Sequence, residues 1–322
     1  MELKIFSVCL LSSFPALSSS LQSSTYPKTW VPVASAYELD PKRPNGVEIL
    51  NSPLVVYKED TDWVVCNGVC SHLLAPLSEG RITKDNHLQC AYHGWEFKSG
   101  TCVKIPQADE NVTRAALANP KCNLRNYPVI VEKNVIWAWL WDEPPSSSAS
   151  ELQQPEFLLR GIANNLTTYS RDLPYSYESL LENLVDPSHV PFAHHGLQGS
   201  REDALPINLI LTTPVSDAGF EFHFRDRTMK MRRQGVGKFR APYIIQYNAQ
   251  YENPKQDDDD DSQFNKVFHL TAICIPTRPG WSRIVLFGAP EKGKQSDKPS
   301  SIAAKIFQLL PVWLIHSLSS RF

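Results

Sequence analysis

The sequence has no long hydrophobic run, no excess of charge of either sign and no internal repeat. No stretch reaches the roughly 18 consecutive apolar residues that suggest a transmembrane helix. Lysine and arginine total 32 against 34 acidic residues, and this balance argues against a nucleic-acid partner. Seven cysteines in 322 residues do not make a disulfide framework, so their spacing must be examined for metal ligands. The 42% hydrophobic content indicates a globular protein, and the length of 322 residues suggests about two domains.

The first 28 residues have the composition of a targeting segment. Lys4 precedes a short apolar run from Ile5 to Leu11, and the stretch that follows is rich in serine. This pattern is typical of a secretory signal or an organelle transit peptide. We therefore expect residues 1–28 to be a targeting segment.

Short runs of β-forming residues, separated by turns, fill the first part of the chain and predict a small all-β domain over residues 29–143. Residues 144–155 are rich in proline and serine and predict a linker. Residues 156–322 combine a helical pattern near 176–190 with further strands, which predicts an α+β domain with an antiparallel sheet. Turns are expected at Pro44-Asn45-Gly46, Asp85-Asn86, Ser99-Gly100 and Lys133-Asn134.

One cysteine and one histidine stand in each of two short motifs, Cys70-Ser71-His72 and Cys90-Ala91-Tyr92-His93. Two Cys and two His could hold a single tetrahedral zinc ion. They could also hold a two-iron, two-sulfur cluster in which one iron takes both Cys and the other both His. Zinc motifs usually pair like ligands in each half, whereas each half here is mixed, and this favours the cluster. The other cysteines have no partner at diagnostic spacing and are expected to be small buried residues: Cys9, Cys66, Cys102, Cys122 and Cys274.

A second group of metal-ligating residue types lies near the middle of the chain. Asp186 and His189 are three residues apart, so a helix would place them on one face, and His194 follows five residues later. Pro187 and Pro191 can kink the segment and bring His194 back toward His189. Two imidazoles and one carboxylate form the facial triad of non-haem iron(II) oxygenases. Alone, however, a pair of histidines at this spacing is more often packing than a metal site.

The sequence CAYHGWEF at 90–97 closely resembles the second cluster loop of the Rieske domain. The first loop departs from that family at Ser71 and Leu73, where proline and arginine are expected. The stretch from Asn183 to His194 resembles the catalytic motif of Rieske oxygenases. The resemblance implies a [2Fe–2S] cluster on Cys70, His72, Cys90 and His93, and a mononuclear Fe(II) on His189 and His194. It also implies that Asp186 bridges to a Rieske histidine of a neighbouring subunit and carries the electron.

Within the Rieske oxygenases, the sequence is similar to the branch that contains pheophorbide a oxygenase and chlorophyllide a oxygenase. This resemblance implies a plastid enzyme that uses O2 and reduced ferredoxin to oxygenate an apolar tetrapyrrole. It is also compatible with a homotrimer and with contact at a membrane surface. The motifs that carry it are Leu77 to Arg81, Cys102 to Gln107, Asp172 to Tyr175, Leu180 to Asn183 and Asp186 to Pro191.

The family also has a third iron ligand, a late carboxylate, for which no residue can be assigned. The stretch from Leu309 to His316 resembles the one just ahead of that carboxylate, which implies a ligand beyond Phe322 and a C-terminally incomplete catalytic domain. An alternative is a non-oxygenating Rieske protein of the plastid envelope that transfers electrons or senses redox state. A further alternative is a Rieske oxygenase that acts on sterols or small aromatics.

Overall fold

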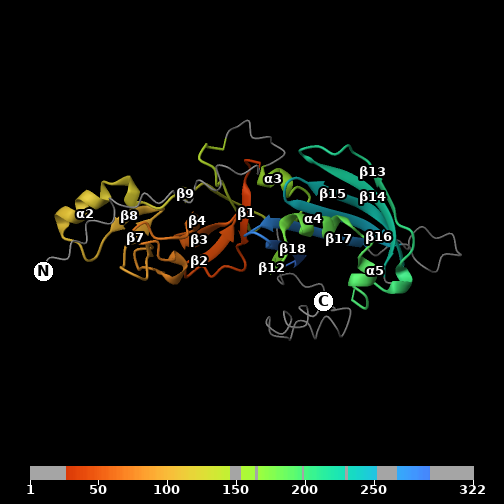
Figure 1. Cartoon of the computed structure of the whole chain (residues 1–322), viewed down its shortest axis with the longest axis horizontal. Coiled ribbons are helices and arrows are strands. Elements are labelled where there is room, and N and C mark those ends of the chain that lie inside the picture. Colours follow the sequence, from red (N-terminus) through yellow and green to blue (C-terminus); the bar gives the residue numbers. More distant parts are fainter. Residues whose placement is uncertain are drawn as a thin grey trace.

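The computed structural model describes residues 27–145, 154–163, 166–197, 199–228, 231–251 and 267–290 (Figure 1). Most of the expected targeting segment and most of the expected linker lie outside these residues, as does the chain from 291 onward. The described residues form two halves, one built of short sheets and one of a single large sheet, arranged along the longest axis of the molecule (Figure 1).

The N-terminal half contains three small antiparallel sheets. The first is β1 (Val31–Ser35), β11 (Val135–Ala138) and β10 (Val129–Glu132), and the second is β2 (Asn45–Ile49), β3 (Ser52–Glu59), β4 (Asp62–Asn67) and β9 (Asn126–Tyr127). The third comprises β5 (Arg81–Ile82), β6 (Leu88–Gln89), β7 (Glu96–Lys98) and β8 (Thr101–Lys104). Three short helices accompany them: η2 (Leu77–Glu79), α2 (Glu110–Leu117) and η3 (Pro120–Cys122).

Three of the four expected turns are present, and one is wrong. Lys133 and Asn134 both have positive φ, 51° and 61°, as a two-residue hairpin between β10 and β11 requires. Asn45-Gly46 is not a turn, because β2 already begins at Asn45. The side-chain amide of Asn45 instead donates to the backbone carbonyls of Asp40 and Arg43, each at 2.9 Å, and so closes the loop that precedes the strand.

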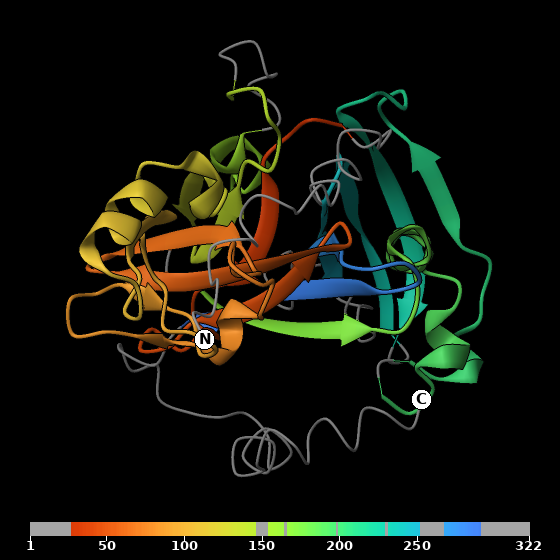
Figure 2. The ribbon, with the colours of Figure 1, turned by 60° about the vertical axis from the view of Figure 1, so that its left-hand side comes forward.

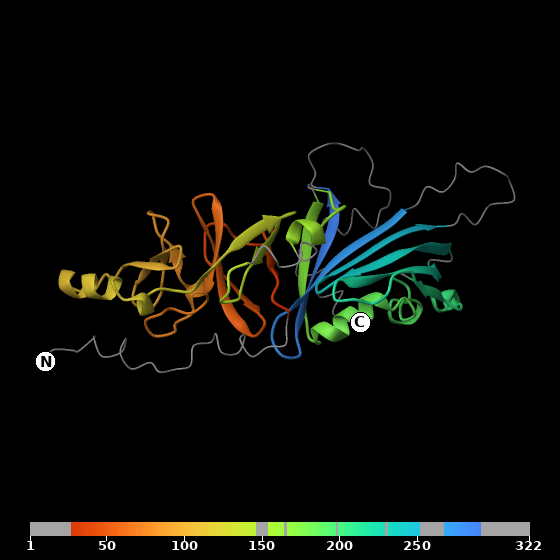
Figure 3. The ribbon, with the colours of Figure 1, turned by 90° about the horizontal axis from the view of Figure 1, so that it is seen from above.

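The C-terminal half is a seven-stranded antiparallel sheet in the order β12-β18-β17-β16-β15-β14-β13, which confirms the predicted fold class. Figure 2 shows its strong twist, and Figure 3 shows α4 against one face. The strands are β12 (Leu166–Leu173), β13 (Asn208–Leu211), β14 (Gly219–Thr228), β15 (Met231–Arg240), β16 (Ile244–Tyr251), β17 (Val267–Pro276) and β18 (Ser282–Pro290). The helices are α3 (Pro155–Leu158), α4 (Tyr177–Val185), α5 (Val190–Ala193) and η5 (Arg201–Asp203).

Helix α4 is shorter than the helical pattern near 176–190 predicts. The Ser176 hydroxyl caps its first turn by accepting from the Ser179 amide at 3.3 Å, and the helix ends at Val185. Asp186 is extended, with φ −94° and ψ 104°, because the residue before a proline is excluded from the helical region. The expectation that Asp186 and His189 share one helical face is therefore wrong.

The two halves share one hydrophobic core. Trp137 of β11 packs edge-on against Tyr243, with ring centroids 6.2 Å apart, and both side chains are fully buried. The amides of Leu50 and Asn51 donate to the carbonyls of Pro276 and Thr277, at the end of β17, at 3.1 and 2.6 Å. The halves are thus packed against each other through apolar side chains as well as through backbone hydrogen bonds. Across the described segments, no helix has the length and apolar character needed to cross a membrane.

Candidate metal centres

Two loops of the same design carry the four predicted cluster ligands. In each loop the amide of the cysteine donates to the carbonyl five residues later, and the amide four residues later donates back to the cysteine carbonyl. The bonds are Cys70 to Ala75 (2.8 Å) and Leu74 to Cys70 (2.9 Å) in one loop, and Cys90 to Trp95 (2.9 Å) and Gly94 to Cys90 (3.1 Å) in the other. This matched closure turns both Cys-His pairs toward the same place.

Equivalent positions of the two loops have left-handed backbone. Gly94 has φ 71° and Leu74 has φ 58°. Glycine adopts this conformation without strain, whereas leucine does not. Sequence reasoning marked Ser71 and Leu73 as the unusual residues of the first loop, but the strained residue is Leu74. The hydroxyl of Ser71 donates to the carbonyl of Cys122 at 2.6 Å and so ties this loop to η3.

The structure brings the four predicted ligands together. The rings of His72 and His93 lie 4.8 Å apart between centroids, and the Trp95 ring stacks on His72 at 4.7 Å. Cys70 and Cys90 are almost fully buried, with 2% and 3% of their surfaces exposed. Their ligand roles remain a prediction, which the arrangement of the side chains supports.

The chemistry of these side chains fits a [2Fe–2S] cluster. Nδ1 of His72 is buried and has no hydrogen-bond partner, which is costly unless a metal ion binds it. Burial raises the pKa of the Cys70 thiol to about 12, against hydrogen bonds from the His72 and Leu73 amides that lower it. A thiolate here therefore needs a cation. Within the described part of the chain no three His, Cys, Asp or Glu side chains converge on one ion, whereas such a cluster needs only two protein ligands at each iron.

The predicted mononuclear ligands also lie side by side. The rings of His189 and His194 are 5.1 Å apart between centroids, at 62° to each other. His189 stands just before the single turn of α5 and His194 just after it, with Pro191 inside that turn. The helical spacing alone would have separated them, and the break after Val185 followed by this short turn brings them together.

Hydrogen bonds to the backbone orient the rings of His189 and His195. Nδ1 of His189 lies 2.6 Å from the carbonyl oxygen of Asp186, so this nitrogen carries the proton and Nε2 is left for a metal. His195 is held differently, because its Nδ1 accepts the amide proton of Arg201 at 3.2 Å. This arrangement favours His194 over His195 as the second ligand. The described residues do not add a carboxylate to the pair as a third ligand, and the expected ligand beyond Phe322 lies outside them.

The carboxylate of Asp186 is held in its charged form. Partial burial raises its pKa, but hydrogen bonds from the Ser188 hydroxyl and amide and the charge of His189 together hold the pKa below the ordinary value of 3.8. Both the hydroxyl and the amide of Ser188 donate to Oδ1 of Asp186, and the amide nitrogen lies 2.7 Å from it. The helix before Asp186 is anchored by Tyr247, whose hydroxyl donates to the carbonyl of Leu184 at 2.8 Å.

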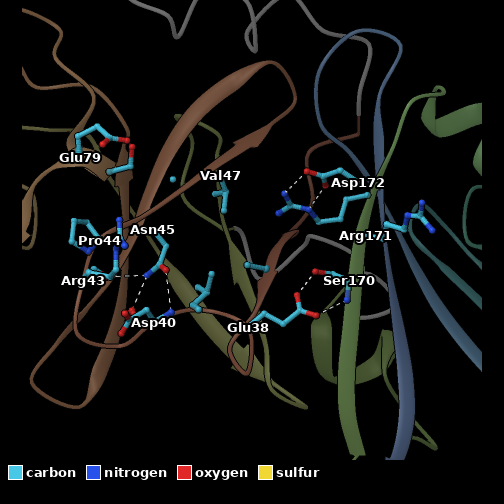
Figure 4. Close-up of a pocket in the computed structure, with 15 residues that line it drawn as sticks. Glu38, Asp40, Arg43, Pro44, Asn45, Val47, Glu79, Ser170, Arg171 and Asp172 are labelled. Carbon is cyan, nitrogen blue, oxygen red and sulfur yellow. Dashed lines mark hydrogen bonds and ion pairs between the residues drawn. The ribbon is translucent and has the colours of Figure 1, made fainter. Parts of the chain in front are cut away.

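A polar cleft lies between the two halves and away from both groups of predicted ligands. It has a volume of about 770 Å³ and a polar lining, and none of the six predicted ligands contributes to it (Figure 4). Arg283 and Asp172 form a two-bond ion pair there, at 2.6 and 3.0 Å, and Glu38 bonds the amide of Ser170. The Glu38 contact joins the two halves, whereas the Arg283–Asp172 pair joins neighbouring strands of the large sheet. A smaller cavity of about 160 Å³ lies behind Pro187 and Pro191, beside the histidine pair.

Comparison with known proteins adds two family matches. Residues 29–128 match the Rieske [2Fe-2S] domain, and residues 239–322 match the pheophorbide a oxygenase model. Flavonoid 8-hydroxylase 2 of Ocimum basilicum is 30% identical over 90% of this chain and 56% of its own length. Pheophorbide a oxygenase of Oryza sativa subsp. japonica is 37% identical over 60% of this chain and 37% of its own length.

Among solved structures, dicamba monooxygenase bound to dicamba matches with a TM-score of 0.62 at 21% identity, covering 81% of this chain and 76% of that one. At this identity the likeness concerns the fold alone. The chain spans little more than half the length of the flavonoid 8-hydroxylase, and less of the pheophorbide a oxygenase.

A Rieske domain followed by a large antiparallel sheet that carries a histidine pair is the fold of the Rieske non-haem iron oxygenases. The match of its C-terminal part to the pheophorbide a oxygenase model and the sequence identity to relatives of that name are more specific. The chain belongs to the family of pheophorbide a oxygenase and chlorophyllide a oxygenase.

Proposed function

We propose that this chain is a Rieske-type oxygenase that uses O2 and electrons from a reduced ferredoxin to oxygenate a chlorophyll-derived macrocycle. The observation that carries the proposal is the pairing of two metal-ligating groups on one fold: Cys70, His72, Cys90 and His93 in matched loops, and His189 with His194 beside α4. A Rieske cluster supplies one-electron transfer, and a mononuclear iron on histidines supplies O2 activation.

The protein side chains supply orientation and protection. The stacked Trp95 covers one face of His72, and the backbone carbonyl of Asp186 fixes which nitrogen of His189 is available. Leu73, Leu74 and Tyr92 form an apolar rim around the cluster loops, with 42%, 56% and 66% of their surfaces exposed. We propose that this rim docks on a second copy of the chain near Asp186, as a homotrimer requires. A rim of this kind suits a protein contact better than solvent.

The substrate class is proposed from the relatives. Pheophorbide a oxygenase and chlorophyllide a oxygenase point to an apolar tetrapyrrole, and their chloroplastic location supports a plastid location for this protein. We propose that it acts there at a membrane surface. The likeness to flavonoid 8-hydroxylase 2, which extends over 90% of this chain, favours a flavonoid as the second candidate. Both are planar aromatic molecules that differ in size.

Iron content and O2 consumption test the proposal. The reconstituted protein should hold two cluster irons and one mononuclear iron per chain. It should consume O2 when supplied with reduced ferredoxin and pheophorbide a, and His189→Ala should retain the cluster absorbance while losing the mononuclear iron and the O2 uptake. O2 uptake with a flavonoid alone would shift the substrate class and leave the oxygenase standing.

A non-oxygenating redox protein is the second candidate function. The observation in its favour is that the described residues place two imidazoles, and no carboxylate as a third ligand, at His189 and His194. This candidate predicts two irons per chain, reversible reduction of the cluster by ferredoxin, and no substrate-dependent O2 uptake. Iron analysis therefore separates the two functions.

A further inference from the structure

Exposed apolar side chains gather on β13, at the edge of the large sheet. All four residues of this strand are exposed, and three of them are apolar: Leu209, Ile210 and Leu211, at 43%, 56% and 52%. Among the described strands β13 is the last of its sheet, on the side away from the N-terminal half (Figures 1 and 2). Its sequence has neither a charge nor a proline, the residues that commonly protect an exposed edge strand.

Three arginines share one face of the neighbouring hairpin, which β14 and β15 form. Arg225 and Arg227 are two residues apart on β14 and so project from the same face, and Arg232 of β15 is directly opposite Arg227. Like charges in directly opposed positions are destabilising. Arg227 has Asp203 at 3.4 Å, whereas Arg225 and Arg232 make no ion pair within the described part of the chain. This face therefore favours an anionic partner.

The acidic side chains of β14 and β15 do not neutralise these arginines. Asp226 projects from the other face of β14, where it forms a two-bond ion pair with Arg233 at 2.9 and 2.5 Å. Glu221 is paired with Lys238 at 2.9 Å. The exposed Asp217 lies in the turn before β14, at the opposite end of the hairpin from the arginines. The positive charge at the far end of the hairpin is thus left in excess.

The strand register joins the arginines and the apolar edge into one surface. Ile210 is directly opposite His223, which is two residues before Arg225, so Ile210 and Arg225 share a face. Leu209 and Leu211 project from the other face of β13. Apolar side chains on both faces suit a partner that accepts the strand edge-on. We call this combination the edge surface, and its residues are Leu209, Ile210, Leu211, Arg225, Arg227 and Arg232.

We propose that the edge surface docks this protein on an anionic lipid bilayer. The inference rests on the proposed membrane-surface location and names the residues that make the contact. Apolar side chains enter the headgroup region, and the arginines beside them attract negatively charged headgroups. A second copy of the chain fits less well, because edge-to-edge pairing would bring two arginine groups of the same sign toward each other.

Sedimentation with lipid vesicles tests the charge contribution on the full-length holoprotein. The wild type should bind vesicles of phosphatidylcholine with phosphatidylglycerol, should bind phosphatidylcholine alone far more weakly, and should dissociate as salt is raised. Arg225→Gln/Arg232→Gln should weaken binding about thirtyfold, since each basic residue at an anionic surface contributes about fivefold. Lys98→Gln/Arg114→Gln removes the same charge from exposed residues of the N-terminal half and should bind like the wild type.

The apolar contribution is tested by a second matched pair in the same assay. Ile210→Ser should weaken binding to the anionic vesicles about fivefold, because an apolar side chain no longer leaves water on docking. Val131→Ser, at a similarly exposed position of β10 in the N-terminal half, should bind like the wild type. Both positions are exposed, so both variants should fold.

A photoreactive p-benzoylphenylalanine in place of Ile210 identifies what covers the edge surface. In the presence of anionic vesicles it should crosslink to lipid. Capture of a second copy or of residues 291–322 would overturn the proposal. Absence of vesicle binding, or equal binding by the wild type and Arg225→Gln/Arg232→Gln, would overturn it as well. Because these assays use neither substrate nor O2, they can fail while iron content and O2 uptake still support the oxygenase.

Discussion

Leu180 connects the hydrophobic core of the large sheet to the predicted mononuclear site, and its truncation is the most informative perturbation. The side chain is 1% exposed and packs with Phe222, Phe224, Ile245 and Tyr247 under α4. Six residues later the chain reaches Asp186, so the placement of Asp186 and the histidine pair depends on how α4 sits on the sheet.

Leu180→Ala should cost about 3–4 kcal/mol of folding free energy. Buried Leu→Ala replacements cost roughly 2.7–5 kcal/mol, and the cost is larger where the surroundings cannot collapse into the cavity. Aromatic rings that are fixed on strands move little, so they should leave most of the cavity unfilled. With a urea m-value of about 3 kcal/mol per molar for a chain of this size, the unfolding midpoint should fall by about 1 M.

Urea titration followed by circular dichroism gives the stability, and iron analysis gives the consequence for the site. The variant should lose mononuclear iron while it retains the visible absorbance of the cluster, because Leu180 packs only in the sheet core. Glu182→Ala, on the exposed side of the same helix, is the matched control and should change stability by less than about 0.5 kcal/mol. A midpoint shift no larger than that of the control, or equal loss of cluster and mononuclear iron, would refute the reasoning.

Three further predictions concern single contacts. Tyr247→Phe should cost about 1 kcal/mol and weaken mononuclear iron binding, measured by chelator competition, because the carbonyl of Leu184 loses its donor. Leu74→Gly should stabilise the oxidised holoprotein slightly, by up to about 1 kcal/mol, whereas Gly94→Ala, at positive φ, should destabilise it in the same melting assay. Burial raises the pKa of Glu96, but hydrogen bonds from His87, Lys104 and Gln89 hold it below 4.5. Its contribution to stability is therefore present above pH 4.5 and lost below it, so acid titration of Glu96→Gln should show a shallower loss of stability than the wild type.

Sequence reasoning found the features that depend on local chemistry. The Lys133-Asn134 hairpin follows from the positive φ that asparagine tolerates, and the two Cys-His motifs follow from ligand type and spacing. It failed where a neighbour decides the backbone. Asp186 has to be extended because Pro187 follows, yet the spacing of Asp186 and His189 suggested that one helical face carries both.

The remaining features depend on contacts between distant segments. The hydrogen bonds from the Ser71 hydroxyl to Cys122 and from the Cys102 amide to the Asn123 side chain join segments whose proximity no local pattern records. The strain at Leu74 was equally hidden, because it becomes apparent only when the two cluster loops are compared in space. The large sheet was predictable as a class, whereas its strand order was not.

The packing of Trp137 against Tyr243 has a practical consequence for handling this protein. A core that spans both halves means that neither can be expressed alone without uncovering apolar side chains, so excised halves should aggregate. It also means that unfolding should be cooperative across the chain. Bleaching of the cluster and loss of sheet structure should then follow one transition. Replacing one half with that of a relative would also require redesign of the apolar contacts between the halves.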